Sequence, residues 1–244
     1  MMPMTWQLPA RPLRSRVLGA VALGLASTLA VATVVTRALT LTSAYPAKAV
    51  LVFAGVAAIV VGQMRGHHPF DRFGLANHVT TARAAIVALI AACIGEASSG
   101  SVAAMAAVGG ALSTALDGVD GWLARRSRMA SEFGARYDME VDALLILVLA
   151  VLAWQLEKAG AWILVAGLMR YLFVAAGYAW QWMETPLPPS VRRKLVCVVQ
   201  IVGLAIVVSP AVSGPASIAL AGVTLVTLSY SFFVDVLWLR RNGA

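Results

Sequence analysis

The amino-acid sequence predicts an all-α polytopic membrane protein, and three observations carry this prediction. Of the 244 residues, 60% are hydrophobic and only 12% are charged, which lies outside the range of soluble globular domains. Apolar runs of about 20 residues, the length that a helix needs to cross a bilayer, recur along the chain. The runs are continuous, whereas the strands of a transmembrane barrel alternate between polar and apolar residues.

The predicted elements fall into two groups of helices. Two spans are expected at residues 17–40 and 47–64, and a polar segment at 64–76 separates them from the rest of the chain. The remaining six spans are expected at residues 77–95, 102–124, 138–156, 160–182, 194–209 and 215–238. We therefore expect an N-terminal cytosolic segment with a transmembrane helix pair (1–69), followed by a six-helix transmembrane domain (70–244).

The first span also resembles a signal peptide, because basic residues precede an apolar run. That run is long for the apolar region of a signal peptide and is not followed by a clear small-residue cleavage site, which favours a retained helix.

The arginine and lysine residues predict which side of the membrane each loop faces. Only Arg37, Lys48 and Lys158 fall on one side. The other side carries Arg11, Arg14, Arg16, Arg65, Arg72, Arg125, Arg126, Arg128, Arg136, Arg192, Arg193, Lys194, Arg240 and Arg241. By the positive-inside rule, both termini are expected in the cytosol and the protein in the inner (cytoplasmic) membrane. The net charge of +8 then attracts anionic membrane lipids, and no nucleic-acid partner is expected because the basic residues are scattered among loops.

Acidic residues are concentrated in one short part of this basic chain. Six of the eleven lie within the 26 positions from Asp117 to Asp142. An aspartate at a helix centre costs about 3 kcal/mol on insertion scales, and neighbouring carboxylates repel one another. Both costs predict a bound cation, and all-carboxylate ligation suits a hard divalent ion such as Mg²⁺ or Mn²⁺.

Helical spacing places the acidic residues on two stripes. Asp117 and Asp120 share one helix face with Gly121 and Ala124, and Asp138 and Asp142 share a face of the next helix with Gly134. A loop of about a dozen residues is expected between these helices, which makes them adjacent and antiparallel, so the stripes meet at one cytosol-facing pocket. The small residues either leave room for a flat group or allow close contact between helices, and Arg125 is suited to bind phosphate.

Two alternatives to a catalytic metal site fit this pattern less well. Helix-end capping or pairing with Arg125 or Arg136 would explain one or two aspartates, but not four on facing stripes with small residues between them. A divalent-cation transporter or channel would distribute carboxylates through the depth of the bilayer, whereas these lie at one cytosolic level. The pattern therefore favours a reaction centre.

The acidic segment resembles the CDP-alcohol phosphotransferase (CDP-alcohol phosphatidyltransferase) family. All eight fixed residues of that family's pattern are present as Asp117-x2-Asp120-Gly121-x2-Ala124-Arg125-x8-Gly134-x3-Asp138-x3-Asp142. The segment Asn77-x2-Thr80-x2-Arg83 is similar to the start of the family's first helix, although Ala76 stands where the family has proline. The resemblance covers about residues 70–240 and leaves the N-terminal helix pair outside a six-helix core.

The resemblance implies a metal-dependent phosphatidyltransferase of phospholipid biosynthesis. Its members move a phosphatidyl group from a CDP-linked donor, usually CDP-diacylglycerol, to a small alcohol acceptor and release CMP. It implies that Asp117, Asp120 and Asp138 bind two ions, Mg²⁺ or Mn²⁺, and that Asp142 contacts one ion and serves as the general base. It further implies a homodimer. The pattern does not distinguish the acceptor alcohol, a lipid from a soluble CDP-donor, or Mg²⁺ from Mn²⁺.

The resemblance also implies how the substrate is bound. Gly121, Ala124 and Gly134 would line the cytidine pocket, and Arg125 would contact the donor phosphates. Asn77 and Thr80 belong to the same expected site, and Arg83 is expected to approach either the donor or the aspartates.

Three residues outside the pattern need separate explanations. Arg170 lies in the middle of a span, where it is expected either to contact substrate in the pocket or to pair with an aspartate such as Asp235. Cys93 and Cys197 are expected near the outer ends of their spans as buried apolar side chains with no metal or redox role.

Overall fold

The structure, a computed structural model, describes residues 11–64, 68–127 and 129–243. Within these ranges the chain forms eight α-helices and no β-strand. Five of the helices are long and apolar enough to cross a membrane. The predicted all-α polytopic membrane protein is therefore confirmed. Arg65 and Arg128, two of the basic residues used to predict orientation, lie outside the described residues.

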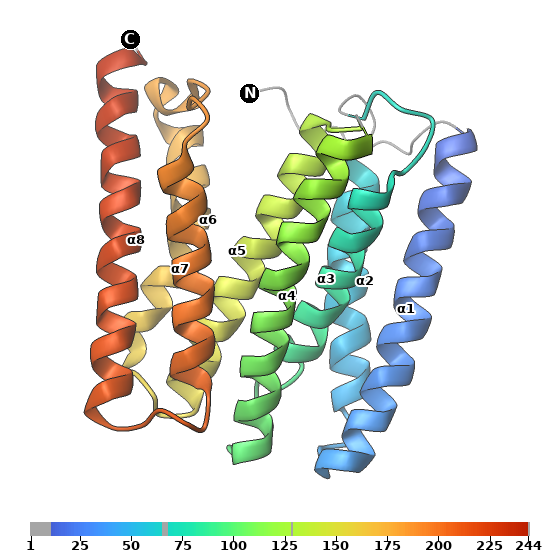
Figure 1. The fold of residues 1–244 in the computed structure, drawn as a ribbon, viewed down its shortest axis with the longest axis vertical. Helices are drawn as coiled ribbons and strands as arrows, with labels where there is room; N and C mark the ends of the chain where they lie inside the picture. Colours follow the sequence, from blue (N-terminus) through green and yellow to red (C-terminus); the bar gives the residue numbers. More distant parts are fainter. Residues whose placement is uncertain (1–10, 65–67, 128, 244) are drawn as a thin grey trace.

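Each predicted span corresponds to one helix, and successive helices run in opposite directions (Figure 1). The eight helices are α1 (Arg11–Leu39), α2 (Tyr45–Gln63), α3 (Leu75–Ala91), α4 (Gly100–Ser127), α5 (Glu132–Gln155), α6 (Leu164–Ala179), α7 (Val191–Val208) and α8 (Pro215–Asn242). Two short 3-10 helices, η1 (Ala161–Ile163) and η2 (Gln181–Glu184), flank α6. Helix α1 begins and α8 ends at the same end of the molecule, as an even number of crossings requires. We call this the aspartate end, because α4 ends and α5 begins there.

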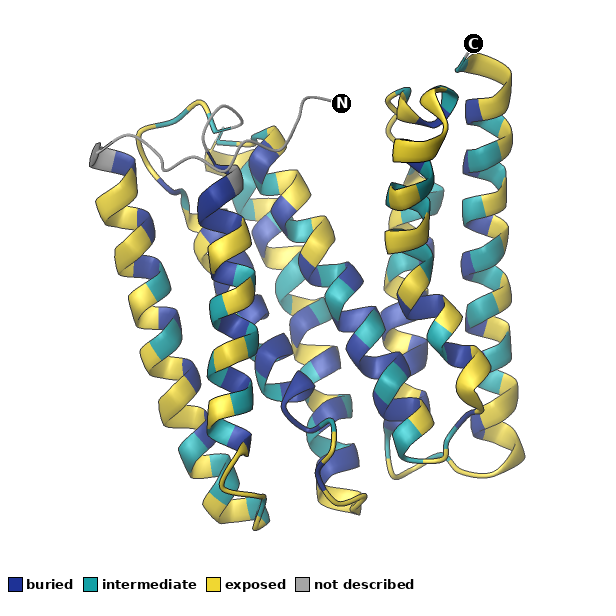
Figure 2. Ribbon diagram, turned by 180° about the vertical axis from the view of Figure 1, so that it is seen from behind, coloured by how far each residue is buried: buried dark blue, intermediate teal, exposed yellow. Residues whose placement is uncertain are grey.

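Helices α3 and α7 connect the two acidic helices, α4 and α5, to the outer helices of the molecule. Helix α3 packs against α1, α2, α4 and α5, whereas α7 packs against α4, α5 and α8. The pair α1–α2 therefore lies to one side of the six remaining helices (Figure 1). Buried residues lie where helices meet, and exposed residues lie on the outward faces (Figure 2). Many of the exposed residues are large and apolar, such as Leu23 and Val226. An outward apolar surface is favourable for helices surrounded by lipid.

The link between α4 and α5 differs from the sequence-based expectation. Helix α4 continues to Ser127 and α5 already begins at Glu132, so the expected loop of about a dozen residues is wrong. Residues at the helix ends favour this extension of both helices. Arg125 and Arg126 lie in the last turn of α4, where cations are favourable. The Ser131 hydroxyl caps α5 by accepting from the Gly134 N–H. The two helices are antiparallel as predicted, but they touch at few positions because α3 and α7 each pack against both.

A buried ion pair joins the N-terminal helix pair to the other helices at the end opposite the aspartates. Glu96, in the link between α3 and α4, accepts hydrogen bonds from Lys48 Nζ at 2.5 Å, from the Thr42 N–H at 2.9 Å and from the Thr42 hydroxyl at 2.7 Å. Lys48 also donates to the Ile94 carbonyl. Burial raises the pKa of Glu96, but the hydrogen bonds and the charge of Lys48 outweigh it, so the pKa is lowered overall.

Candidate active site

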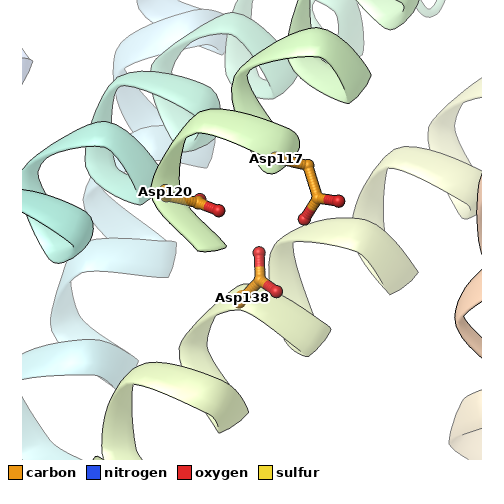
Figure 3. A group of neighbouring side chains, drawn as sticks. All are labelled: Asp117, Asp120 and Asp138. Atoms are coloured by element: carbon orange, nitrogen blue, oxygen red, sulfur yellow. The ribbon is translucent and has the colours of Figure 1, made fainter. Parts of the chain in front are cut away.

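Three carboxylates from two helices converge at the aspartate end of the molecule. Asp117 and Asp120 lie on α4 and Asp138 lies on α5, and their side chains point toward one another (Figure 3). One oxygen atom of each of the three lies within 4.8 Å of the others. Asp142 lies one turn further along α5. The sequence-based expectation that the two acidic stripes face a common site agrees with this geometry.

Arg83 of α3 lies at the centre of this group. Its Nη1 atom is 3.1 Å from Asp117 Oδ1 and 2.9 Å from Asp120 Oδ2, and it also contacts Asp138 Oδ1. Its Nη2 atom donates to Asp142 Oδ1. The arginine side chain is 0% exposed, so a single guanidinium pairs with all four aspartates from within the protein. Of the two roles expected for Arg83, the structure shows the contact with the aspartates.

The four carboxylates differ in their access to the surroundings. The side chains of Asp117 and Asp138 are 31% and 35% exposed, whereas those of Asp120 and Asp142 are 5% and 15% exposed. Thr80 donates its hydroxyl to Asp120 Oδ2 at 3.1 Å. The site is therefore open on the side of Asp117 and Asp138 and closed behind Asp120 and Asp142.

The group is chemically suited to divalent cations. Four ionised carboxylates and one guanidinium carry a net charge of −3, which is unfavourable in a partly buried site without further positive charge. The three converging oxygens provide a hard, all-oxygen ligand set of the kind that Mg²⁺ and Mn²⁺ prefer. The residues present thus fit the ions that the sequence pattern predicts.

The small residues of the pattern lie beside polar side chains from other positions. A Cβ atom on Gly134 would lie 3.1 Å from Asn77 Oδ1 and 3.3 Å from the Ser131 hydroxyl. Asn77 is buried and donates to the Phe73 carbonyl at 2.5 Å. On α4, a Cβ atom on Gly121 would lie 3.4 Å from Arg125 Nη1. The structure therefore brings Asn77 to Gly134 and Arg125 to Gly121, while Ala124 lies half-buried one turn from Gly121.

Comparison with known proteins agrees with this geometry. A family model described as CDP-alcohol phosphatidyltransferase matches residues 73–233. The chain belongs to this family. No curated protein and no solved structure matches it significantly.

Membership of the CDP-alcohol phosphatidyltransferase family makes the protein a transferase that acts on a CDP-alcohol and moves a phosphatidyl group. The matched range begins just before α3 and ends within α8, so it includes every residue of the site described above. Helices α1 and α2 lie outside the matched range.

Arg170 is the predicted site residue that the structure places apart from the family's aspartates. It pairs with Glu140, which lies on α5 between Asp138 and Asp142 in sequence but on a different face of the helix. The suggested partner of Arg170, Asp235 of α8, instead pairs with Arg192 and Arg193 of α7. Arg170 and Asp235 therefore do not pair with each other in the structure.

Cys197 lies beside the site, at a position that differs from the one expected from the sequence. The cysteine was expected near the outer end of its span, but it lies six residues into α7, which begins at the aspartate end. Its thiol lies 3.5 Å from Asp142 Oδ2 and donates to it. The basic residues Arg192 to Lys194 mark the start of α7, so counting from them would have placed Cys197 at the depth of the aspartates.

Proposed function

We propose that this family member transfers a phosphatidyl group from CDP-diacylglycerol to a small alcohol and releases CMP, as a step of phospholipid biosynthesis. The observation that carries this proposal is the convergence of Asp117, Asp120 and Asp138, with Asp142 held beside them by the same arginine. Family membership supports the reaction class, and the position of the site at one end of membrane helices supports a lipid donor.

A lipid donor suits this position for a physical reason. Its acyl chains stay among the apolar outer faces of the helices, while its cytidine and phosphates reach the open side of the site near Asp117 and Asp138. Gly121, Ala124 and Gly134 would line the cytidine pocket, with Asn77 beside Gly134. Arg125 would contact the donor phosphates, since a guanidinium binds phosphate oxygens through two parallel hydrogen bonds.

In the proposed reaction, Asp117, Asp120 and Asp138, with Asp142 as an additional ligand, would hold two divalent ions, Mg²⁺ or Mn²⁺. Such ions neutralise negative charge on the oxygens of a pyrophosphate during phosphoryl transfer. The acceptor oxygen forms a bond to the phosphorus that carries the diacylglycerol, and the bond from that phosphorus to the oxygen of CMP breaks. Asp142 accepts the proton of the acceptor hydroxyl, and the hydrogen bonds from Arg83 and Cys197 hold its carboxylate in place.

The cation transporter or channel considered as an alternative receives no specific support. The four aspartates lie within the last turns of α4 and the first turns of α5, at one end of the molecule. A permeation path would need polar groups along the whole depth of the membrane.

The proposed setting of the enzyme rests on the distribution of charge. The aspartate end carries Arg125, Arg126, Arg192 and Arg193, which supports a cytosolic active site and cytosolic termini in the inner membrane. A homodimer is proposed from the resemblance to the family alone.

The first test supplies purified protein with CDP-diacylglycerol, Mg²⁺ or Mn²⁺ and a panel of alcohols, and measures CMP release. Replacing Asp142 by asparagine should lower turnover by roughly a factor of 100 or more, because a positioned general base contributes at least that much. Glu132→Gln provides the matched control, since it removes an exposed carboxylate from the same helix.

The two arms of the test answer different questions. Near-normal turnover of Asp142→Asn would show that Asp142 is not the general base. Failure of the wild-type protein to release CMP with any alcohol would contradict the proposed reaction.

A further inference from the structure

Arg83 lies at the middle of α3, at the level of the four aspartates, and its side chain is wholly enclosed. Nη1 faces Asp117, Asp120 and Asp138, while Nη2 faces Asp142. Because α3 packs between α4 and α5, this side chain reaches both acidic helices at once. No other cation pairs with these four aspartates among residues 11–64, 68–127 and 129–243.

The guanidinium and a divalent ion would use the same carboxylates. The three aspartates whose oxygens lie within 4.8 Å of one another are the three that pair with Nη1. A cation bound by these carboxylates would therefore lie within a few ångströms of a fixed positive charge. Like charges at such distances repel strongly in a partly buried site.

The net charge of the site, with and without Arg83, shows how the arginine affects the binding of ions and donor. Four carboxylates and Arg83 sum to −3, so two divalent ions bring the loaded site to +1. Without the arginine, the four carboxylates sum to −4 and the loaded site would be neutral. Arg83 thus opposes the binding of the ions and leaves the loaded site attractive to a pyrophosphate, which carries negative charge on its oxygens.

We propose that Arg83 is a built-in counter-ion of the metal site, which weakens the affinity of the four aspartates for divalent ions and gives the loaded site a positive charge toward the anionic donor. This inference rests on the proposed function. A purely structural role for Arg83 predicts the opposite effect on metal affinity. If the arginine only held the carboxylates in place, removing it would weaken metal binding.

The test measures the affinity of purified protein for Mn²⁺ in the absence of donor, by electron paramagnetic resonance. Arg83→Gln should lower the dissociation constant about tenfold or more, because a nearby positive charge is removed. Arg83→Lys keeps the positive charge but replaces the guanidinium, whose two Nη atoms reach four carboxylates, by a single ammonium group. The Mn²⁺ dissociation constant of this variant should therefore lie between those of Arg83→Gln and wild type. Arg37→Gln removes an exposed positive charge at the opposite end and should leave the dissociation constant unchanged.

Folding is followed alongside binding, because Arg83→Gln leaves four carboxylates without their resident partner. The variant is purified in Mg²⁺, and chelation should lower its thermal midpoint by more than it lowers that of wild type. If Arg83→Gln does not fold even with Mg²⁺, the comparison of Arg83→Lys with wild type decides.

The outcomes separate this inference from the proposed function. If the Arg83 variants bind Mn²⁺ no more tightly than wild type, the role proposed for Arg83 is wrong, while the proposed metal site still stands. A wild-type protein that binds neither Mn²⁺ nor Mg²⁺ would overturn the metal site itself.

Discussion

At the scale of single residues, the four aspartates are held by the protein to different degrees. Asp120 accepts hydrogen bonds from Thr80 and Arg83, and Asp142 accepts them from Arg83 and Cys197. Both are more enclosed than Asp117 and Asp138. Fixed hydrogen bonds orient a carboxylate before substrate arrives, which suits a base that must meet a hydroxyl in one position.

Gly134 provides a prediction at this scale. A methyl group there would lie 3.1 Å from Asn77 Oδ1 and 3.3 Å from the Ser131 hydroxyl, so one of these neighbours must move. We expect Gly134→Ala to raise the KM for the CDP donor by about tenfold or more, the effect of losing roughly 1.4 kcal/mol of binding, with a smaller change in kcat. Initial rates of CMP release at varied donor concentration would measure this.

Gly118→Ala is the matched control for this prediction. Gly118 lies on α4, where an added Cβ meets no atom within 4 Å, and alanine favours the helix. An unchanged KM in Gly134→Ala would show that this glycine does not line the cytidine pocket.

Most of the site's residues could be predicted from the sequence, but several of their partners could not. The eight fixed residues of the pattern follow from spacing along the chain, which determines a helix face. The contacts of Cys197 with Asp142 and of Glu140 with Arg170 depend on how separate helices are rotated against each other. Neither spacing nor composition specifies that rotation.

At the scale of elements, the start of α5 determines where Gly134 and Asp138 lie. The Ser131 hydroxyl accepts from the Gly134 N–H at 3.1 Å and lies 3.3 Å from His68 Nδ1. Ser131→Ala should cost about 1 kcal/mol of stability through loss of the cap and should also raise the donor KM, since the first turn of α5 would fray. Thermal unfolding in detergent and donor titrations would measure the two effects.

Ser99 offers a cap of the same kind away from the site. Its hydroxyl accepts from the Val102 N–H at 3.2 Å at the start of α4, at the opposite end of the molecule. Ser99→Ala should cost a similar free energy and leave the donor KM unchanged. If both serine variants changed the KM equally, the effect would come from general loss of stability and not from the start of α5.

The helices were predictable as apolar runs, but their ends were not. Each of the eight spans expected from the sequence corresponds to a helix. Helices α4 and α5 extend beyond their apolar runs through Arg125, Arg126 and Glu132, because charged residues are favourable in terminal turns. An apolar run marks the part of a helix that prefers lipid, and the helix itself ends where its backbone is capped.

At the scale of the whole molecule, Glu96 joins the N-terminal pair to the family domain and gives a prediction about pH. Because the pKa of Glu96 is lowered in the folded protein, its stabilising contribution is present above the ordinary glutamate pKa of about 4.3. The contribution is lost as the pH falls through the lowered folded value. Glu96→Gln should therefore have a lower thermal midpoint than wild type at pH 7. The difference between the two midpoints should become smaller as the pH falls below about 4.

Glu157→Gln is the control for this measurement, because Glu157 is exposed at the same end of the molecule. Thermal midpoints of the three proteins between pH 7 and pH 3 would test the prediction. A difference between Glu96→Gln and wild type that stays constant over this range would contradict it.

The packing order of the helices was the least predictable feature. The helices that carry the two acidic stripes were expected to be adjacent, yet α4 and α5 touch at few positions, and α3 and α7 each pack against both. From its central place in α3, Arg83 pairs with carboxylates of both acidic helices. From the sequence, Arg83 was expected near either the donor or the aspartates, and the packing of α3 against α4 and α5 shows which of the two it contacts.

The burial of Arg83 also has a consequence for how the chain enters the membrane. As α3 leaves the ribosome, it carries an arginine at the middle of 17 residues, and an isolated arginine there costs about 2.5–3.5 kcal/mol on insertion scales. Its partners are synthesised later, since Asp120 follows by 37 residues and Asp142 by 59. We therefore expect α3 to stay at the translocon or the membrane surface until α4 and α5 emerge, and these three helices to enter the bilayer as one unit.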